Sequence, residues 1–291
     1  MISGCAQTTA TSGCSPRLRR VRLAWTAAAL LCATAGVARA ELPNLPKAPL
    51  ALVLVGDSTM ATGTGYGDAL CHRVAAGAAC LNLARGGRST RSYRAEGLWE
   101  QALAQLHAYP AGTAIYVLIQ FGHNDQPGKP GRSTDLNREY PANLATFVAE
   151  VRAAGGKPVL VTPLTRRSFT KAGALIDDLR PWALAMREVA RRQQVPLVDL
   201  YGRSATAVQA MGPALSKQMA VTHEGKPGFD TAHLGAKGAC VFSDMVWHGL
   251  VAQEPAWGAQ PAIHRPPRGN ISADRLHPER SRYSLARRWM R

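Results

Sequence analysis

Residues 51–59 read ALVLVGDST, and this segment indicates the class of fold. The apolar run at residues 51–55 is continuous rather than alternating, which predicts a strand that is buried on both faces. The run ends at Gly56, and the polar residues Asp57, Ser58 and Thr59 follow at once. A buried strand that opens into a polar loop is typical of a parallel sheet covered by helices, so we expect further strands separated by helices.

Such segments alternate along the rest of the chain. Short apolar runs predict further strands at residues 80–83, 114–121, 158–162 and 196–200. Helical spacing of apolar residues predicts helices at residues 67–76, 95–107, 138–154, 177–194 and 234–252. The alternation predicts an α/β fold, a three-layer α/β/α sandwich around a five-stranded parallel sheet.

The N-terminus has the features of an export signal. Arginines between residues 17 and 22 precede an apolar run at residues 23–37, which ends at the small-x-small pattern Ala38-Arg39-Ala40. We therefore expect residues 1–40 to be a signal peptide and the protein to be secreted or periplasmic. A membrane anchor is the alternative, but about 15 apolar residues are short for a full span, so no span is expected after cleavage.

The remainder divides into a linker, one domain and a tail. We expect a linker at residues 41–49 and a single domain at residues 50–253, followed by a basic, disordered tail at residues 254–291 that is rich in Pro and Arg. The chain has 35 Lys and Arg against 19 Asp and Glu, but 5 of the basic residues lie in residues 1–40 and 8 in residues 265–291. The modestly basic body suits a polyanionic substrate, and no partner nucleic acid is expected.

Three of the six cysteines follow the expected signal peptide. In an oxidising compartment a bridge between Cys71 and Cys80 is plausible, because the short loop would tie a helix to the next strand. Cys240 would then be an unpaired and buried thiol.

Polar loops follow the first three expected strands, and a fourth polar segment precedes the last helix. These segments are residues 56–59 (GDST), 85–89 (RGGRS), 122–125 (GHND) and 230–233 (DTAH). The carboxyl ends of parallel strands meet at one edge of a sheet, so we expect the loops to lie close together. Together they contain Ser, His, Asp and backbone or amide donors, which are the parts of an acyl-transfer site.

Each motif has an ordinary structural explanation when it is taken alone. Ser58 would cap a helix or fill a turn, and residues 86–87 would form a tight turn. Asp230 and His233 would be an exposed pair before a helix. The glycines at residues 63–67 lack the spacing of a dinucleotide loop after a strand. His123 is given no chemical role, so the prediction rests on the four motifs together.

The four motifs in this order resemble the SGNH (GDSL-type) hydrolase superfamily, and within it they are most similar to rhamnogalacturonan acetylesterases. The resemblance lies in GDSTM at residues 56–60, GRSTRS at residues 87–92, GHND at residues 122–125 and TPLTRRSF at residues 162–169. It implies a flavodoxin-like SGNH hydrolase fold over residues 50–252.

The resemblance also implies a role for five residues. Ser58 is the expected nucleophile, His233 its general base, and Asp230 the carboxylate that orients the imidazole. The oxyanion hole is expected to consist of the Ser58 N–H, the Gly87 N–H and the Asn124 side-chain amide. No metal and no organic cofactor are expected.

The implied reaction is removal of acetyl groups from an acidic plant polysaccharide, rhamnogalacturonan or another pectin, through an acyl-serine intermediate. Arg88 and Arg91 lie beside the expected oxyanion loop, so we expect them to contact galacturonate carboxylates. Their alternative role is in structural ion pairs. Other functions remain open: an acetyl xylan esterase, a broad lipase or thioesterase of the same superfamily, or a non-catalytic carbohydrate-binding surface protein. The complete Ser/Gly/Asn/Asp/His set argues against the last.

Overall fold

The structure is a computed structural model and describes residues 49–222 and 229–259. The expected signal peptide lies outside these residues, as do nearly all of the expected linker and most of the expected tail.

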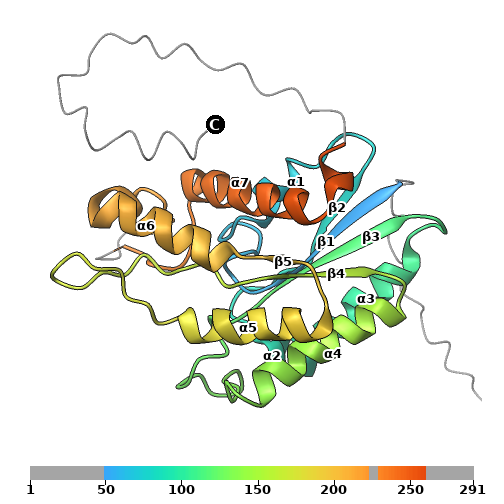
Figure 1. The fold of residues 1–291 in the computed structure, drawn as a ribbon, viewed down its shortest axis with the longest axis horizontal. Coiled ribbons are helices and arrows are strands. Elements are labelled where there is room, and N and C mark those ends of the chain that lie inside the picture. The colour runs from blue at the N-terminus through green and yellow to red at the C-terminus, as the bar shows by residue number, and fades with distance from the viewer. Residues whose placement is uncertain (1–48, 223–228, 260–291) are drawn as a thin grey trace, which may run out of the picture. The chain divides into compact units, whose positions relative to one another are not determined.

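Five parallel strands form one sheet in the order β2-β1-β3-β4-β5, as expected from the sequence (Figure 1). The strands are β1 (Leu50–Gly56), β2 (Ala79–Asn82), β3 (Ala114–Gln120), β4 (Lys157–Val161) and β5 (Leu197–Val198).

Helices cover both faces of this sheet and give the expected three layers: α1, α6 and α7 lie on one face, and α2 to α5 lie on the other (Figure 1). The helices are α1 (Gly67–Cys71), α2 (Thr90–Ala95), α3 (Leu98–Ala108), α4 (Glu139–Ala153), α5 (Arg180–Gln193), α6 (Leu200–Lys217) and α7 (Ala236–Gln253), followed by the 3-10 turn η1 (Pro255–Trp257).

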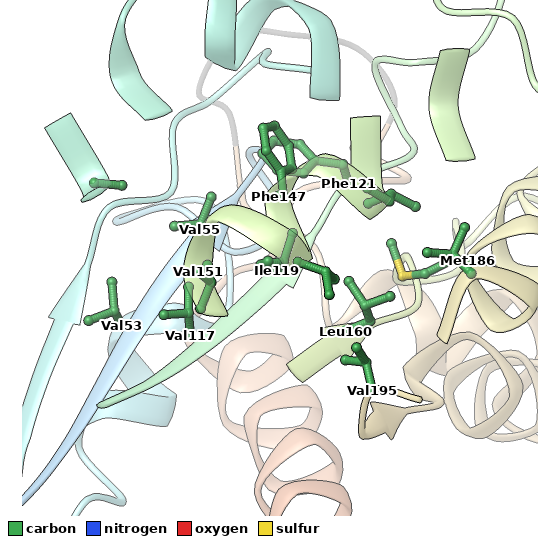
Figure 2. Close-up of a cluster of buried hydrophobic side chains, with 14 of the residues drawn as sticks. Val53, Val55, Val117, Ile119, Phe121, Phe147, Val151, Leu160, Met186 and Val195 are labelled. Atoms are coloured by element: carbon green, nitrogen blue, oxygen red, sulfur yellow. The ribbon is translucent and has the colours of Figure 1, made fainter. Parts of the chain in front are cut away.

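The strands are apolar throughout because each one supplies side chains to two hydrophobic clusters. Within β1, Val53 belongs to the cluster beneath α4 and Leu52 to the cluster beneath α7, and both are fully buried. Figure 2 shows the first cluster, in which Phe147 and Val151 of α4 come together with Ile119 of β3. Burial of each such side chain stabilises the fold by about 1.5–3 kcal/mol, which fixes the strands from which the loops of the site emerge.

The strand order marks one place in the sheet as the expected binding site. The chain passes from β1 to β2 on one side and then crosses to β3 on the other side of β1. In open α/β sheets of this order, ligands bind beyond the carboxyl ends of the strands where the direction reverses. The loops after β1 and β3, which carry Ser58 and Asn124, flank this position.

Two helices were not expected from the sequence. Residues 200–217 form α6, in which Gly212 has a φ of 67° and Pro213 follows it, so two helical pieces meet at a break. Glycine and proline are typical of turns and helix ends, so their presence at that point does not predict a helix. The short helix α2 is capped by Ser89, and Gly97 with a φ of 71° separates it from α3. The expected helix at residues 95–107 therefore begins too early.

Secondary structure continues past the expected domain end at residue 253. Residues 255–257 form η1, and Trp257 is 1% exposed. Its ring packs against Tyr116 and Trp247. The expectation of disorder from Glu254 onward is therefore wrong for this turn, because a single aromatic side chain buries enough apolar surface to order it.

The pairing of the cysteines follows the expectation, but the burial of Cys240 does not. Cys71 and Cys80 form a disulfide that joins α1 to β2. Cys240 is free, but it is exposed rather than buried. It lies on the outer side of α7, while the neighbouring Phe242 and Ser243 face the interior.

Candidate active site

Ser58 lies in a tight turn directly after β1. The turn is closed by hydrogen bonds from the Met60 and Ala61 N–H groups to the Asp57 carbonyl. Asp57 Oδ1 accepts hydrogen bonds from the Thr59 N–H at 2.9 Å and from the Thr59 hydroxyl at 2.8 Å. Ser58 remains 9% exposed, so the turn presents its hydroxyl at the carboxyl edge of the sheet while both flanking side chains are fully buried.

Two of the glycines at residues 63–67 allow the backbone of their segment to pack directly against this turn. A Cβ on Gly65 would lie 2.4 Å from the Met60 nitrogen and the Thr59 carbonyl, and a Cβ on Gly67 would lie 2.2 Å from the Met60 carbonyl oxygen. Hydrogen bonds from the Tyr66 N–H to Thr59 O and from the Gly67 N–H to Met60 O hold the two segments in contact. Glycine is required here because only a residue without a side chain permits so close an approach of two backbones.

Asp230 and His233 form a joined pair in the turn before α7. Asp230 Oδ2 lies 2.7 Å from His233 Nδ1, and Asp230 Oδ1 accepts the N–H groups of Ala232 at 2.9 Å and His233 at 2.8 Å. The carboxylate therefore fixes both the turn and the ring. With the Nδ1 proton directed at Asp230, the neutral imidazole has Nε2 available as a proton acceptor.

Thr64 connects the His233 turn to the Ser58 turn. The Thr64 hydroxyl donates to the Ser58 carbonyl at 2.8 Å, and the Thr64 carbonyl accepts the N–H of Leu234 at 2.8 Å. Two segments more than 160 residues apart in the sequence are thus linked through a single residue. No direct hydrogen bond joins the Ser58 hydroxyl to the His233 ring within the described ranges.

The expected oxyanion donors lie on the neighbouring loops. Gly86 packs on the Ser58 side chain, since a Cβ on it would lie 3.7 Å from Ser58 Cβ, and Gly87 adopts a φ of 78°. Asn124 Nδ2 donates to the Arg88 carbonyl at 3.0 Å, which joins this loop to the one after β3. The Ser58 and Gly87 N–H groups donate to no acceptor among the residues the structure describes, and one Asn124 amide hydrogen remains for a ligand.

A buried electrostatic contact beneath the Ser58 turn was not foreseen. His123 is 3% exposed, and its Nδ1 lies 3.5 Å from Asp57 Oδ2, which is close enough for attraction but long for a hydrogen bond. Burial alone would raise the pKa of Asp57, but the His123 ring and the two hydrogen bonds from Thr59 hold that pKa below its ordinary value. The His123 ring therefore favours the charged form of the Asp57 carboxylate, which accepts the two hydrogen bonds of Thr59 in the Ser58 turn.

Asp125 joins the remaining loops. Its Oδ1 accepts hydrogen bonds from the Thr90 N–H at 3.1 Å, the Thr90 hydroxyl at 2.5 Å and the Thr134 hydroxyl at 3.1 Å. Burial raises the pKa of Asp125 to about 7 in spite of these hydrogen bonds, and nearby Asp57 adds to the effect. The third motif thus links the loop after β2 to the loop after β3 through a carboxyl group that is costly to ionise.

Asp125→Asn will reduce the pH dependence of stability between about pH 4 and pH 7. The folded chain keeps the Asp125 proton up to about pH 7, whereas the unfolded chain releases it near the ordinary value of 3.8. This contribution is therefore complete below the unfolded pKa and is lost as the pH rises through the folded pKa, by at most about 4 kcal/mol.

Urea midpoints at pH 4.5 and pH 8 measure this effect, and Asp244→Asn is the control because Asp244 is a half-exposed ion-pair partner of Arg73. We expect the midpoint of the wild type to fall more between the two pH values than that of Asp125→Asn. Equal changes in the two proteins would show that Asp125 ionises normally.

Arg167 holds the turn that carries Asp230 and His233. Its guanidinium is fully buried and donates to the carbonyls of Asp230 at 2.9 Å, Ala232 at 3.4 Å and His233 at 2.6 Å. Its own N–H donates to the Thr231 carbonyl at 2.8 Å. Burial lowers the pKa of Arg167 to about 10, so the group stays charged at neutral pH. The residue lies in the TPLTRRSF motif, but its function became visible only through these contacts.

Arg88 and Arg91 are both engaged in ion pairs. Arg88 Nε and Nη2 lie 2.8 Å and 2.7 Å from Glu96 Oε2, and Arg88 Nη1 donates to the Gly86 carbonyl at 2.7 Å. Arg91 pairs with Glu139 at the start of α4. These contacts correspond to the alternative role of the two arginines, and a role in substrate binding would require them to leave their partners.

Two features are absent from residues 49–222 and 229–259. No three His, Cys, Asp or Glu side chains come together there in a way that would hold a metal ion. None of the helices in these ranges has the length and apolar character needed to cross a membrane.

Solved structures share the fold. The crystal structure of the Bacillus subtilis protein YxiM superposes with a TM-score of 0.59 at 24% identity, over 72% of this chain and 57% of that protein. Axe2, an acetylxylan esterase from Geobacillus stearothermophilus, gives a TM-score of 0.52 at 18% identity, over 74% of this chain and 97% of Axe2. At these identities the similarity concerns the fold alone.

Similarity in sequence is more specific. The rhamnogalacturonan acetylesterase RhgT of Bacillus subtilis is 34% identical over 218 residues, which are 70% of this chain and 90% of RhgT. A rhamnogalacturonan acetylesterase of Emericella nidulans is 45% identical over 236 residues, which are 74% of this chain and 91% of that protein. Residues 54–240, more than half of the chain, match the GDSL-like Lipase/Acylhydrolase family. The chain therefore belongs to this family, the SGNH hydrolases, and is a carboxylic ester hydrolase.

Proposed function

We propose that the protein is a secreted serine esterase that removes acetyl groups from rhamnogalacturonan. The observation that carries the proposal is the Asp230–His233 pair, joined through Thr64 to the turn of Ser58. A serine hydroxyl is a weak nucleophile unless a base removes its proton, and an imidazole oriented by a carboxylate is the base that acyl transfer requires.

The reaction proceeds in two halves. His233 Nε2 takes the Ser58 proton as the oxygen attacks the acetyl carbonyl, and the imidazolium then protonates the departing sugar oxygen, which leaves as a hydroxyl group. Asp230 stabilises the imidazolium that forms between these steps. In the second half His233 takes a proton from water, the hydroxide attacks the acetyl-serine, and acetate leaves as the proton returns to Ser58.

Three hydrogen-bond donors stabilise the negative charge that develops on the carbonyl oxygen. The N–H groups of Ser58 and Gly87 are not used within the described chain, and the Asn124 amide has one hydrogen left beside its contact to the Arg88 carbonyl. Donors fixed in this way contribute about 3 kcal/mol each to the stability of the transition state. Asp57, His123 and Asp125 hold the three loops together, so the donors are fixed before the substrate binds.

The substrate and the location rest on different observations. Two relatives at 34% and 45% identity are named rhamnogalacturonan acetylesterases, and both are covered over about nine tenths of their length. Export rests on the arginine cluster and the apolar run of residues 1–40. Acetylated pectin lies outside cells, so the two parts of the proposal support each other.

Acetate release from a panel of esters tests the proposal. The panel contains acetylated rhamnogalacturonan, acetylated homogalacturonan, acetylated xylan, and aryl esters of acetate and octanoate. We expect the highest kcat/KM among the polymers on acetylated rhamnogalacturonan, and faster release of acetate than of octanoate.

Each other outcome selects a different function. Release from xylan alone would keep the reaction and replace the substrate, and a preference for octanoate would indicate a lipase. Release from none of the esters by correctly folded protein would indicate a carbohydrate-binding protein without activity.

A further inference from the structure

Two basic side chains beside the expected oxyanion donors lack an acidic partner. Lys129 Nζ donates to the His123 carbonyl and lies 3.5 Å from Asn124 Oδ1. Arg132 Nη1 donates to the Gly87 carbonyl at 3.3 Å. In the described part of the chain neither is within ion-pair distance of an Asp or Glu, in contrast to Arg88 and its neighbour Arg91.

The loop that carries these two cations is built to hold them in place. The N–H groups of Arg132 and Ser133 both donate to the Lys129 carbonyl, at 3.0 Å and 2.9 Å. The Ser133 hydroxyl accepts the Lys129 N–H at 2.9 Å and donates to the Gln126 carbonyl at 2.8 Å. A short closed turn therefore carries both residues, which are half-buried and reach the loops of Asn124 and Gly87.

The two charges repel each other. Burial lowers the pKa of Lys129, and the nearby guanidinium groups of Arg166 and Arg132 lower it further. Asp57 and Asp125 offset part of this effect on Lys129 from beyond ion-pair distance. Arg166 has an ion-pair partner in Asp178, so the charges without such a partner in the described chain are those of Lys129 and Arg132. A bound anion would remove this repulsion and use donors that now meet only backbone carbonyls and an amide oxygen.

We propose that Lys129 and Arg132 form the subsite that binds a galacturonate carboxylate next to the acetylated sugar. The inference rests on the proposed function and changes its expected residues, because Arg88 and Arg91 are already neutralised by Glu96 and Glu139. The guanidinium and ammonium groups provide the charge-assisted hydrogen bonds that a carboxylate accepts. Their contacts to Gly87 and Asn124 place this charge beside the ester to be cleaved.

Calorimetric titration with an unacetylated oligogalacturonide tests the subsite without catalysis, because this probe carries carboxylates and no ester. We expect Lys129→Gln and Arg132→Gln each to weaken binding about tenfold or more. Lys157→Gln is the matched control, since it removes one charge from the other end of the sheet, where Lys157 contacts Tyr116. Arg132→Lys retains the charge and should retain most of the affinity. Urea midpoints confirm that each variant is folded.

Kinetics test the same subsite during turnover. We expect the KM for an acetylated rhamnogalacturonan fragment to rise about tenfold in each Gln variant, and kcat/KM to fall more on this fragment than on an aryl acetate, which has no carboxylate. Reducing the carboxyl groups of the fragment to alcohols should raise the KM of the wild type and leave that of the double variant unchanged. Added salt should weaken wild-type binding more than that of the double variant.

The outcomes separate the subsite from the proposed function. An equal loss on the aryl acetate would mean that these side chains serve the reaction itself, and equal binding of the acidic and reduced fragments would exclude a carboxylate subsite. A loss confined to Arg88→Gln or Arg91→Gln would move the subsite to those residues. Calorimetric binding without turnover of rhamnogalacturonan would keep the subsite and reject the proposed substrate.

Discussion

Ser58→Ala will lower kcat for acetate release by about 10⁵-fold and leave the protein folded. The remaining rate reflects the oxyanion donors and substrate binding, which persist without a nucleophile. The Ser58 hydroxyl makes no hydrogen bond within the described residues, and the side chain is small, so its removal should change the free energy of unfolding by less than about 0.5 kcal/mol. The loss of activity can then be assigned to chemistry rather than to unfolding.

Initial rates on an aryl acetate and on acetylated rhamnogalacturonan measure the effect. Ser243→Ala is the control, because Ser243 is a buried serine on α7 that bonds to Arg73 and the Cys240 carbonyl. Acid quenching during turnover of the wild type, followed by mass spectrometry, should find an acetyl group on the peptide that contains Ser58. Full activity in Ser58→Ala, or an acetyl group on another residue, would overturn the serine mechanism.

The sequence predicts the sheet well because each buried strand can be recognised from its own short run of apolar residues. Residues 51–55 and 114–121 are continuous apolar runs, and a strand with both faces covered has no other pattern available. The structure confirms the five strands and their parallel arrangement. Residues 200–217 are harder to predict because Gly212 and Pro213 interrupt the helix, which is stabilised by packing of its buried residues rather than by propensity.

The candidate site also combines features that the sequence predicts with features that it does not. The motifs predict that Ser58, Gly87 and Asn124 lie at one edge of the sheet, and the contacts of Gly86 and Asn124 agree. Their catalytic roles stay predictions. The ion-pair partners of Arg88 and Arg91 could not be predicted from the sequence, because an ion pair with Glu96 or Glu139 depends on where α2 and α4 lie in space. A sequence shows a cation but not whether the fold has already neutralised it.

Arg167→Met will lower kcat about 100-fold per folded molecule and leave KM nearly unchanged. Arg167 contacts neither Ser58 nor the expected oxyanion donors, so substrate binding should persist. Without its guanidinium, the carbonyls of Asp230 and Ala232 lose a donor and that of His233 keeps only the Val221 N–H. The turn should then hold the imidazole less well, and a misplacement of about 1 Å is sufficient for such a loss of rate.

The matched control is Arg152→Met, because Arg152 also donates to two backbone carbonyls, those of Gln193 and Gln194, at the opposite edge of the sheet. Circular dichroism gives the folded fraction of each variant, and rates are divided by it. Arg167→Lys keeps the charge but cannot span three carbonyls with one ammonium group, so it should recover only part of kcat. If the rate per folded molecule of Arg167→Met equals that of Arg152→Met, Arg167 stabilises the fold without positioning His233. A fall in kcat at constant KM, partly recovered by lysine, requires that the buried guanidinium acts through the geometry of the Asp230–His233 turn.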